Sequence, residues 1–198
     1  MNFPLTICKI FGLRPSIWMI RNPMKIYEFQ EIINGANLNC NHRVLDFGCG
    51  KGHWSIIMSK KCKHVTGIDI NPKKIILSKK YLKSILATKK VEFICNDLIS
   101  QQFPDSSFDR LISLCVLEHI NNLEDVLYEI FRILAPNGEL HVSVDSLSNI
   151  DDAMIVEDHK IKHAVHQYFT RESLSQILTS HGFELIDVYP ILKGEKAK

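Results

Sequence analysis

The sequence has no C-x-x-C pair, although it contains six cysteines. Thiolate zinc sites are usually built from such closely spaced pairs, so this class of site is not predicted. The cysteines are spread through apolar segments, and their spacing suggests no disulfide framework. We therefore expect a protein of a reducing, cytoplasmic setting.

Long apolar runs are also missing. No segment approaches the roughly 20 apolar residues of a membrane-spanning helix, and Lys9, Arg14 and Pro15 interrupt the one candidate, at the N-terminus. The same segment lacks the charged start, unbroken apolar stretch and small-residue cleavage site of a secretory signal. We expect no membrane span, and residues 1–26 are predicted either to lie on a membrane surface or to cover the active site.

Neither sign of charge predominates. The chain has 24 basic and 22 acidic residues and a formal net charge of +2, which is too balanced to predict binding to nucleic acid or to an anionic membrane. A chain of 198 residues, 45% of them apolar, can bury one sizeable core but is short for two. Residues 1–198 are therefore predicted to form a single domain.

Two kinds of apolar segment alternate along the chain. Short runs bounded by turn residues are typical of buried strands, and longer segments with helical spacing are typical of helices. The predicted strands are Arg43–Phe47, His64–Ile70, Val91–Ile94, Phe108–Leu114, Leu140–Val144 and Phe183–Ile191. The predicted helices are Tyr27–Ala36, His53–Lys61, one starting at Asn71-Pro72, Leu123–Leu134 and Arg171–Gly182, with a turn at Pro136–Gly138.

Strands that alternate with helices form βαβ units with right-handed crossovers, and hence a mainly parallel sheet with helices on both faces. This order predicts an α/β protein with a three-layer, Rossmann-like architecture. In such sheets, ligands bind at the carboxyl ends of the strands.

A glycine-rich turn follows the first predicted strand. Gly48, Gly50 and Gly52 let the backbone turn sharply and approach a ligand without obstruction by a side chain. A dinucleotide fingerprint needs its third glycine one position later, where this chain has His53. Asp46 precedes the turn, and its carboxylate would repel a pyrophosphate but favour an ammonium or sulfonium group. The turn therefore favours a small uncharged or cationic group over NAD.

Two further acids end neighbouring predicted strands. Asp69 lies 19 residues after Gly50, about the offset at which an acidic residue accepts hydrogen bonds from both ribose hydroxyls. Asp97 ends the third strand and could accept a hydrogen bond from an adenine amine. Each acid alone is equally well explained as the cap of a helix or turn. Their joint placement with Asp46 at three strand ends favours a ligand site.

Five segments resemble successive motifs of the class I S-adenosylmethionine-dependent methyltransferases. They are Val44–Gly52, Gly67–Ile70, Asn96–Leu98, Phe108–Ile120 and Arg132–Leu140. The resemblance runs from about residue 27 to residue 189. It is closest to the ubiquinone-biosynthesis-type and related small-molecule enzymes, whose fourth strand commonly ends in a similar Leu-Glu-His. It implies methyl transfer from S-adenosyl-L-methionine to oxygen or carbon of a small-molecule acceptor.

By this resemblance, the glycine turn would line the methionine part of the cofactor. Asp69 would bind the ribose and Asp97 the adenine amine, while Ile70 and Leu98 would pack on the adenine faces. The full set of predicted cofactor-binding residues is Asp46, Gly48, Cys49, Gly50, Gly52, Trp54, Asp69, Ile70, Asn96, Asp97, Leu98 and Cys115.

The sheet of this family normally has seven strands, the last running antiparallel between the fifth and sixth. Only a short, charged tail follows Ile191, so six strands are predicted, with the usual seventh missing. Either the chain is truncated or the sheet edge is completed in another way. An unpaired sheet edge invites pairing, which makes a homo-oligomer one prediction. Residues 146–169 are predicted to form the insertion that usually covers the acceptor.

Glu118 and His119 follow the fourth predicted strand, at the rim where the acceptor should arrive, and are the predicted catalytic residues. Methyl transfer from a sulfonium needs no metal, because the protein mainly has to align the nucleophile. A base is needed only if the acceptor loses a proton, and histidine suits that role near neutral pH. Alternatively, His119 only packs or contacts the cofactor. Some relatives hold a divalent cation with Glu-x-x-Glu-His, but Cys115 replaces the first glutamate here, so no metal is predicted.

His159, His163 and His166 are spaced so that they would share one face of a helix. Such a face could hold zinc or contact an anionic or phenolic acceptor. The charged residues between them make a solvated face equally compatible with the spacing.

The same residues bear on three other functions. Methylation of nucleic-acid bases is disfavoured, because the amino-methylating enzymes carry a Pro-Pro-aromatic tetrapeptide where this chain has Ser113–Val116, and the balanced charge lacks a basic footprint. A non-catalytic S-adenosylmethionine-binding or scaffolding protein would keep the glycine turn without an acceptor pocket. A nicotinamide oxidoreductase shares the architecture but needs the displaced third glycine.

Overall fold

The computed structural model describes residues 22–84, 90–146 and 153–191, and in these residues five parallel strands form a sheet in the order β3-β2-β1-β4-β5. The strands are β1 (Arg43–Phe47), β2 (His64–Asp69), β3 (Val91–Cys95), β4 (Phe108–Leu114) and β5 (Leu134–Ser143). The first strand, β1, lies in the middle of the sheet, and β2 and β3 extend it to one edge. The chain then crosses back to form β4 on the other side of β1. This order places a switch point between β1 and β4, where ligands bind in such sheets.

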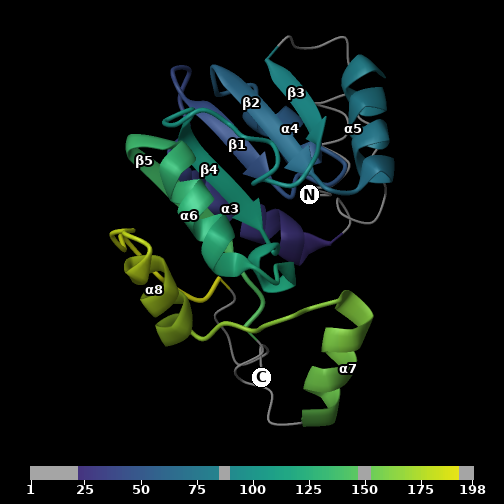
Figure 1. The fold of residues 1–198 in the computed structure, drawn as a ribbon. Coiled ribbons are helices and arrows are strands. Elements are labelled where there is room, and N and C mark those ends of the chain that lie inside the picture. The colour runs from purple at the N-terminus through teal and green to yellow at the C-terminus, as the bar shows by residue number, and fades with distance from the viewer. Residues whose placement is uncertain (1–21, 85–89, 147–152, 192–198) are drawn as a thin grey trace.

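Helices cover both faces of the sheet (Figure 1). On one face, α3 (Pro23–Ala36), α4 (His53–Met58) and α5 (Pro72–Ser84) share a hydrophobic core with the strands. On the other face, α6 (Leu123–Ile133) and α8 (Arg171–Ser180) share a second core, which also contains Leu117 of the short 3-10 helix η1 (Leu117–His119). The predicted three-layer, Rossmann-like α/β fold is confirmed. Among the described helices, none combines the length and the apolar content needed to cross a bilayer.

Polar caps decide where two of the helices begin. The Asn22 side chain accepts a hydrogen bond from the Met24 N–H at 3.0 Å, and Pro23 occupies the first turn of α3, where a missing N–H costs least. Thr170 and Ser173 form a reciprocal capping box at the start of α8. The cap at Asn22 explains why α3 begins four residues before its predicted start.

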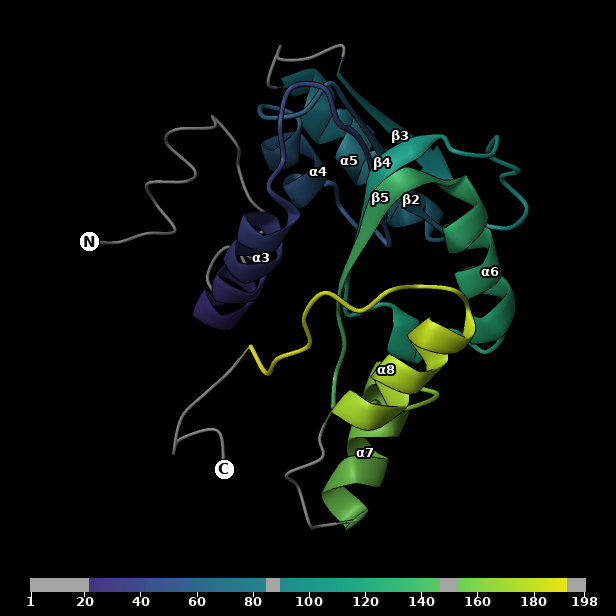
Figure 2. The ribbon, with the colours of Figure 1, turned by 90° about the vertical axis from the view of Figure 1, so that its left-hand side faces the viewer.

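The predicted sixth strand, Phe183–Ile191, is wrong: residues 183–190 form no strand, and β5 is the edge of the described sheet. Phe183 packs against the core beneath α6 and α8, whereas Ile191 packs against the core on the α3 side. Between these anchors, Leu185 and Ile186 are 36% and 82% exposed. The segment therefore passes around the end of the sheet from one face to the other, as Figure 2 shows. Its apolar residues pack against two different cores. In the sequence, this produces a pattern of apolar and polar residues like that of a half-buried strand.

The fifth strand is longer than predicted and irregular. Pairing with β4 jumps from Phe108–Leu134 to Arg110–Glu139, so the predicted turn at Pro136–Gly138 lies in a bulge within β5 rather than before the strand. Asn137 has φ 61° in this bulge.

Candidate active site

The glycine-rich loop joins β1 to α4 and is fastened to the neighbouring strand. The N–H groups of Gly48 and Cys49 donate hydrogen bonds to the Ile68 carbonyl of β2, at 2.9 and 3.0 Å. The φ angles of Gly48, Gly50 and Gly52 are 74°, 55° and 74°, in the left-handed region that side chains disfavour.

The three glycines differ in what surrounds them. A Cβ atom at Gly48 would lie 2.3 Å from Val116, and one at Gly52 would lie 2.3 Å from the Phe93 ring. A Cβ atom at Gly50 would meet no atom within 4 Å. Packing therefore requires Gly48 and Gly52, whereas Gly50 borders open space.

Asp69 ends β2 with its carboxylate directed at this loop. Its Oδ2 atom accepts a hydrogen bond from the Gly50 N–H at 2.9 Å, and its Oδ1 atom accepts one from the Asn71 N–H at 2.8 Å. The Lys74 ammonium lies 3.8 Å from Oδ2. Only 8% of Asp69 is exposed, so the predicted acid lies buried beside the one glycine that is open.

Asp46 lies deeper, within β1, and is 3% exposed. The Ser55 hydroxyl of α4 donates a hydrogen bond of 2.5 Å to its Oδ2 atom. Burial raises the pKa of Asp46 to about 7; the hydrogen bond from Ser55 opposes this shift and the charge of Asp69 reinforces it. This carboxyl group is therefore poised between its neutral and charged forms near neutral pH, and a nearby cation would favour the charged form.

The end of β3 adds the remaining predicted polar residues. Asp97 is exposed and its Oδ1 atom accepts a hydrogen bond from the Ser100 N–H at 2.8 Å, which lowers the pKa of Asp97. Asn96 bonds to the Gln101 side chain and to the Asp97 N–H. Asp97 thus does cap a turn, and its contact with a cofactor stays a prediction.

Two apolar residues of the predicted set lie in contrasting places. Ile70 is 73% exposed at the end of β2, whereas Leu98 is 2% exposed within the core. Trp54 is also buried, with its ring stacked on Phe29 of α3 at a centroid distance of 3.9 Å. Trp54 therefore joins α4 to α3 by packing, and its contact with a cofactor stays a prediction.

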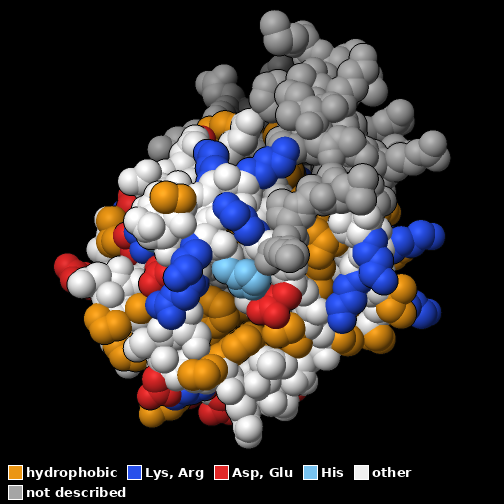
Figure 3. Space-filling model, turned by 90° about the horizontal axis from the view of Figure 1, so that it is seen from above, with side chains coloured by type: hydrophobic (Ala, Val, Ile, Leu, Met, Phe, Trp, Pro, Cys, Tyr) orange, Lys and Arg blue, Asp and Glu red, His pale blue; other side chains and the backbone are white. Residues whose placement is uncertain are grey.

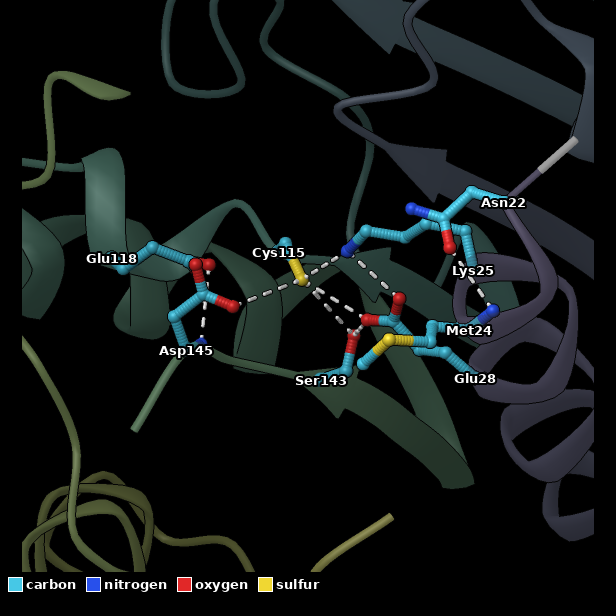
Figure 4. Close-up of polar contacts among 8 residues, drawn as sticks. All are labelled: Asn22, Met24, Lys25, Glu28, Cys115, Glu118, Ser143 and Asp145. Atoms are coloured by element: carbon cyan, nitrogen blue, oxygen red, sulfur yellow. Dashed lines mark hydrogen bonds and ion pairs between the residues drawn. The ribbon is translucent and has the colours of Figure 1, made fainter. Parts of the chain in front are cut away.

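A polar cluster lies at the ends of β4 and β5, beside α3 (Figure 4). The Cys115 thiol donates a hydrogen bond of 3.0 Å to Glu28, and the Lys25 ammonium lies 2.8 Å from the Cys115 sulfur and 2.8 Å from the Glu28 carboxylate. The Ser143 hydroxyl donates to the same Glu28 oxygen at 2.5 Å. Sequence reasoning found Cys115 but missed Lys25, Glu28 and Ser143, because no motif joins residues that are 28 to 115 positions apart.

Glu118 is completely buried in η1 and connects to Asp145. Its Oε1 atom accepts a hydrogen bond from the Asp145 N–H at 3.3 Å, and its Oε2 atom has no hydrogen-bond partner among the described residues. Burial raises the pKa of Glu118, and the charge of Asp145 adds to the shift. His119, in contrast, is exposed, and its Nδ1 atom lies 3.0 Å from the Ala164 carbonyl oxygen. Asp145 is a fourth residue that sequence reasoning missed.

One atom each of Cys115, Glu118 and Asp145 lies within 4.8 Å of the other two, a spacing that could hold a metal ion. The chemistry of the donors fits a metal poorly. Burial raises the pKa of the Cys115 thiol, and the Lys25 ammonium already occupies its surroundings. A cysteine binds a metal ion as a thiolate, and the neighbouring Lys25 ammonium would repel the ion. No step is therefore assigned to a metal.

The three histidines between β5 and α8 do not share one helical face. α7 (Ala153–His163) ends at His163, and Ala164, with φ 51°, turns the chain before His166. The rings of His159 and His163 are tilted by 36° with their centroids 4.4 Å apart, and His159 Nδ1 lies 2.7 Å from the Tyr168 hydroxyl. The prediction of a shared face is wrong because helical spacing continues in the sequence beyond the end of the helix.

His53 begins α4 and is 2% exposed, against Tyr81. Neither ring nitrogen has a hydrogen-bond partner among the described residues. Burial lowers the pKa of His53 from 6.5 to about 4, with a contribution from the charge of Lys51. The folded protein therefore holds this ring neutral.

We expect His53 to cost the folded state stability as the pH falls from about 6.5 to about 4, because in this window only the unfolded chain binds a proton there. The full shift corresponds to about 3 kcal/mol. His53→Phe should lose this pH dependence and remain folded near pH 8. Urea unfolding of both proteins across this range measures the difference in their free energies of unfolding. Asp46, whose pKa is raised in the folded state, stabilises both proteins equally as the pH falls, so its contribution cancels in this difference. Parallel curves would contradict the expectation.

Comparison with known proteins assigns the family. A family model described as "Methyltransferase domain" matches residues 22–188. The 24-methylenesterol C-methyltransferase 2 of Oryza sativa subsp. japonica is 31% identical over 153 residues, which are 73% of this chain and 42% of that protein. The mitochondrial ubiquinone biosynthesis O-methyltransferase of Schizosaccharomyces pombe is 25% identical over 85% of this chain and 65% of that protein. The chain thus spans less than half the length of the rice relative.

Solved structures share the fold. Phosphoethanolamine N-methyltransferase 2 of Haemonchus contortus, solved in complex with S-adenosyl-L-methionine, superposes with a TM-score of 0.74 at 16% identity, over 92% of this chain and 42% of that one. The YcgJ protein from Bacillus subtilis gives 0.70 at 19% identity, over 79% and 68%. At such identities the likeness shows the fold alone. The family model covers most of the sequence, and the chain belongs to the methyltransferase domain family, as its motifs predicted.

Proposed function

We propose that this chain transfers the methyl group of S-adenosyl-L-methionine to an oxygen or carbon atom of a small-molecule acceptor. The observation that carries the proposal is the pairing of Asp69 with Gly50, in which a buried carboxylate is held against a glycine that borders open space. The methyltransferase family supports the reaction type. The names of the sterol and ubiquinone methyltransferases among the relatives support a small-molecule acceptor.

The cofactor would lie across the carboxyl ends of β1, β2 and β3. Its methionine part would follow the glycine loop, and its ribose hydroxyls would donate hydrogen bonds to Asp69. Ile70 offers an exposed apolar surface to the adenine ring, and Asp97, with Asn96 beside it, offers an acceptor to the adenine amine.

The acceptor would approach from the ends of β4 and β5, next to Val116, which contacts Gly48. S-adenosyl-L-methionine supplies an electrophilic methyl group on a sulfonium, so the chain's own residues have to align the acceptor and remove its proton when it has one. In this proposal, the carboxyl group of Glu118 or of Asp145, which lie next to each other, would receive that proton. The raised pKa of Glu118 brings its proton affinity closer to neutral pH.

We expect Glu118→Gln to lower turnover by about 100-fold, the usual range for a lost general base, with little change in stability because the amide keeps the shape. His119→Ala should change turnover less than about threefold, because His119 is exposed and its ring nitrogen Nδ1 is paired with the Ala164 carbonyl. The dependence of turnover on pH separates a proton-transfer role from a structural one. If Glu118 accepts the proton, the rise of turnover with pH that reflects its ionisation should be absent in Glu118→Gln. Full turnover of Glu118→Gln would show that Glu118 is not the general base. Either His119 would then be the base, or alignment of the acceptor alone would suffice.

Two competing functions are separated by binding and product formation. Calorimetry should show micromolar binding of S-adenosyl-L-methionine and no binding of NAD; the reverse would support a nicotinamide oxidoreductase. Incubation with methyl-labelled cofactor and fractionated cell extract should yield a labelled small molecule. Cofactor binding without any labelled product would support the scaffolding alternative, and label in nucleic acid would exclude a small-molecule acceptor.

Several expectations about the whole chain stay predictions. The predicted acceptor insertion, residues 146–169, contains α7, but residues 147–152 lie outside the described residues, as do residues 1–21 of the predicted N-terminal cover. A homo-oligomer formed by pairing of the β5 edge and a cytoplasmic setting are part of the proposal. Sedimentation of the purified protein tests the first.

A further inference from the structure

The charge of the chain is balanced only on average. Residues 60–90 hold ten of the 24 basic residues but one of the 22 acidic residues, Asp69. All ten are lysine, and none is arginine. The rest of the chain consequently carries more acidic than basic residues.

Seven of these lysines are exposed at one end of the molecule, where β2 and β3 begin and α5 ends. We call them the lysine face: Lys60, Lys61, Lys63, Lys79, Lys80, Lys83 and Lys90. Figure 3 looks onto this end and shows basic side chains spread across it around a histidine. Glu92 is the acid nearest in sequence, and it is already engaged by His64 and Thr66.

We propose that the lysine face binds the surface of an anionic phospholipid bilayer. Clusters of four to eight basic residues on a helix or beside it are attracted to anionic headgroups, with about tenfold in affinity gained for every one or two lysines. Lysine is a compact point charge suited to such a diffuse surface, whereas recognition of phosphodiesters relies more on bidentate arginine and on aromatic stacking. Ile76, 66% exposed one turn before Lys79 and Lys80, adds an apolar side chain that can enter the headgroup region.

The lysine face and the candidate cofactor site lie at opposite ends of the sheet. It lies at the amino ends of β2 and β3, whereas Gly50 and Asp69 lie at the carboxyl end of the sheet. A docked molecule therefore presents its glycine loop to solution. Saturating amounts of vesicles should leave the affinity for S-adenosyl-L-methionine unchanged.

The test is co-sedimentation of the full chain with phosphatidylcholine vesicles that contain or lack phosphatidylglycerol. Binding should require phosphatidylglycerol and should fall steeply with added salt, because exposed charges are screened. Lys80→Glu/Lys83→Glu should weaken it by about 30-fold or more. The matched control Lys160→Glu/Lys162→Glu makes the same charge change on α7 and should bind within about threefold of the unaltered protein.

Equal binding to neutral vesicles, no binding at low salt, or equal losses in both double variants would overturn the proposal. Binding of duplex DNA but not of vesicles would assign the face to nucleic acid instead. Circular dichroism on each variant shows whether it is folded, and calorimetry shows whether it still binds the cofactor. A failure of the proposed function would appear as loss of cofactor binding, which depends on Asp69 and its loop and not on the lysine face.

Discussion

Replacing Asp69 with alanine should lower the affinity for S-adenosyl-L-methionine by about 100-fold or more. A hydrogen bond to a charged group contributes about 1.5–3 kcal/mol, and two ribose hydroxyls would lose their common acceptor. The variant also removes the acceptor of the Gly50 N–H, which positions the loop. Calorimetry with the cofactor measures the loss, after urea unfolding has shown that the variant is folded.

Asp109→Ala is the matched control for this prediction. Like Asp69, Asp109 accepts hydrogen bonds within the protein, here from the backbone and side chain of Arg43, but it is only partly buried and lies at the amino end of β4. Its removal should cost stability and leave cofactor affinity within about twofold. Unchanged affinity in Asp69→Ala would mean that the glycine loop serves another ligand.

Replacing Gly52 with alanine should destabilise the fold by about 2–5 kcal/mol. A left-handed φ costs an ordinary residue about 1–2 kcal/mol, and overpacking of a core adds about 1–3 kcal/mol. At Gly52 both terms apply, because φ is 74° and the new Cβ would lie 2.3 Å from the Phe93 ring and 2.8 Å from the Ser78 Cβ.

Gly50→Ala separates the two terms. Its φ of 55° imposes the backbone cost, but its Cβ enters open space. We expect a loss of only about 1–2 kcal/mol in stability, together with a larger loss of cofactor affinity than the mild destabilisation explains. Urea unfolding and calorimetry measure both quantities. Equal destabilisation by the two substitutions would show that the surroundings of Gly52 relax and that packing does not require a glycine there.

The bounds of β1 and β4 were predicted without error because each is an apolar run ended by a clear turn or polar signal, which depends only on neighbouring residues. The placement of Asp69 and the glycine turn at the same end of the sheet followed from the rule that ligands bind at the carboxyl ends of parallel strands; the hydrogen bond between Asp69 and Gly50 was not predicted.

The errors have a common physical origin in tertiary contacts. Residues 183–191 alternate like a strand, yet their apolar side chains anchor on opposite sides of the sheet. The contacts of Lys25 and Glu28 with Cys115 join α3 to the end of β4, and only the folded chain brings these segments together. No periodicity or spacing in the sequence carries such information.

Glu118 also closes a loop of the chain. Its side chain accepts the Asp145 N–H, and its main-chain carbonyl accepts the N–H groups of His166 and Gln167, at 2.8 and 3.3 Å. Both ends of the intervening stretch are thereby fastened to one residue, and closing a longer loop costs little additional entropy. A change in the length of this stretch would therefore leave both of its anchors on Glu118, and the sheet beside them, in place.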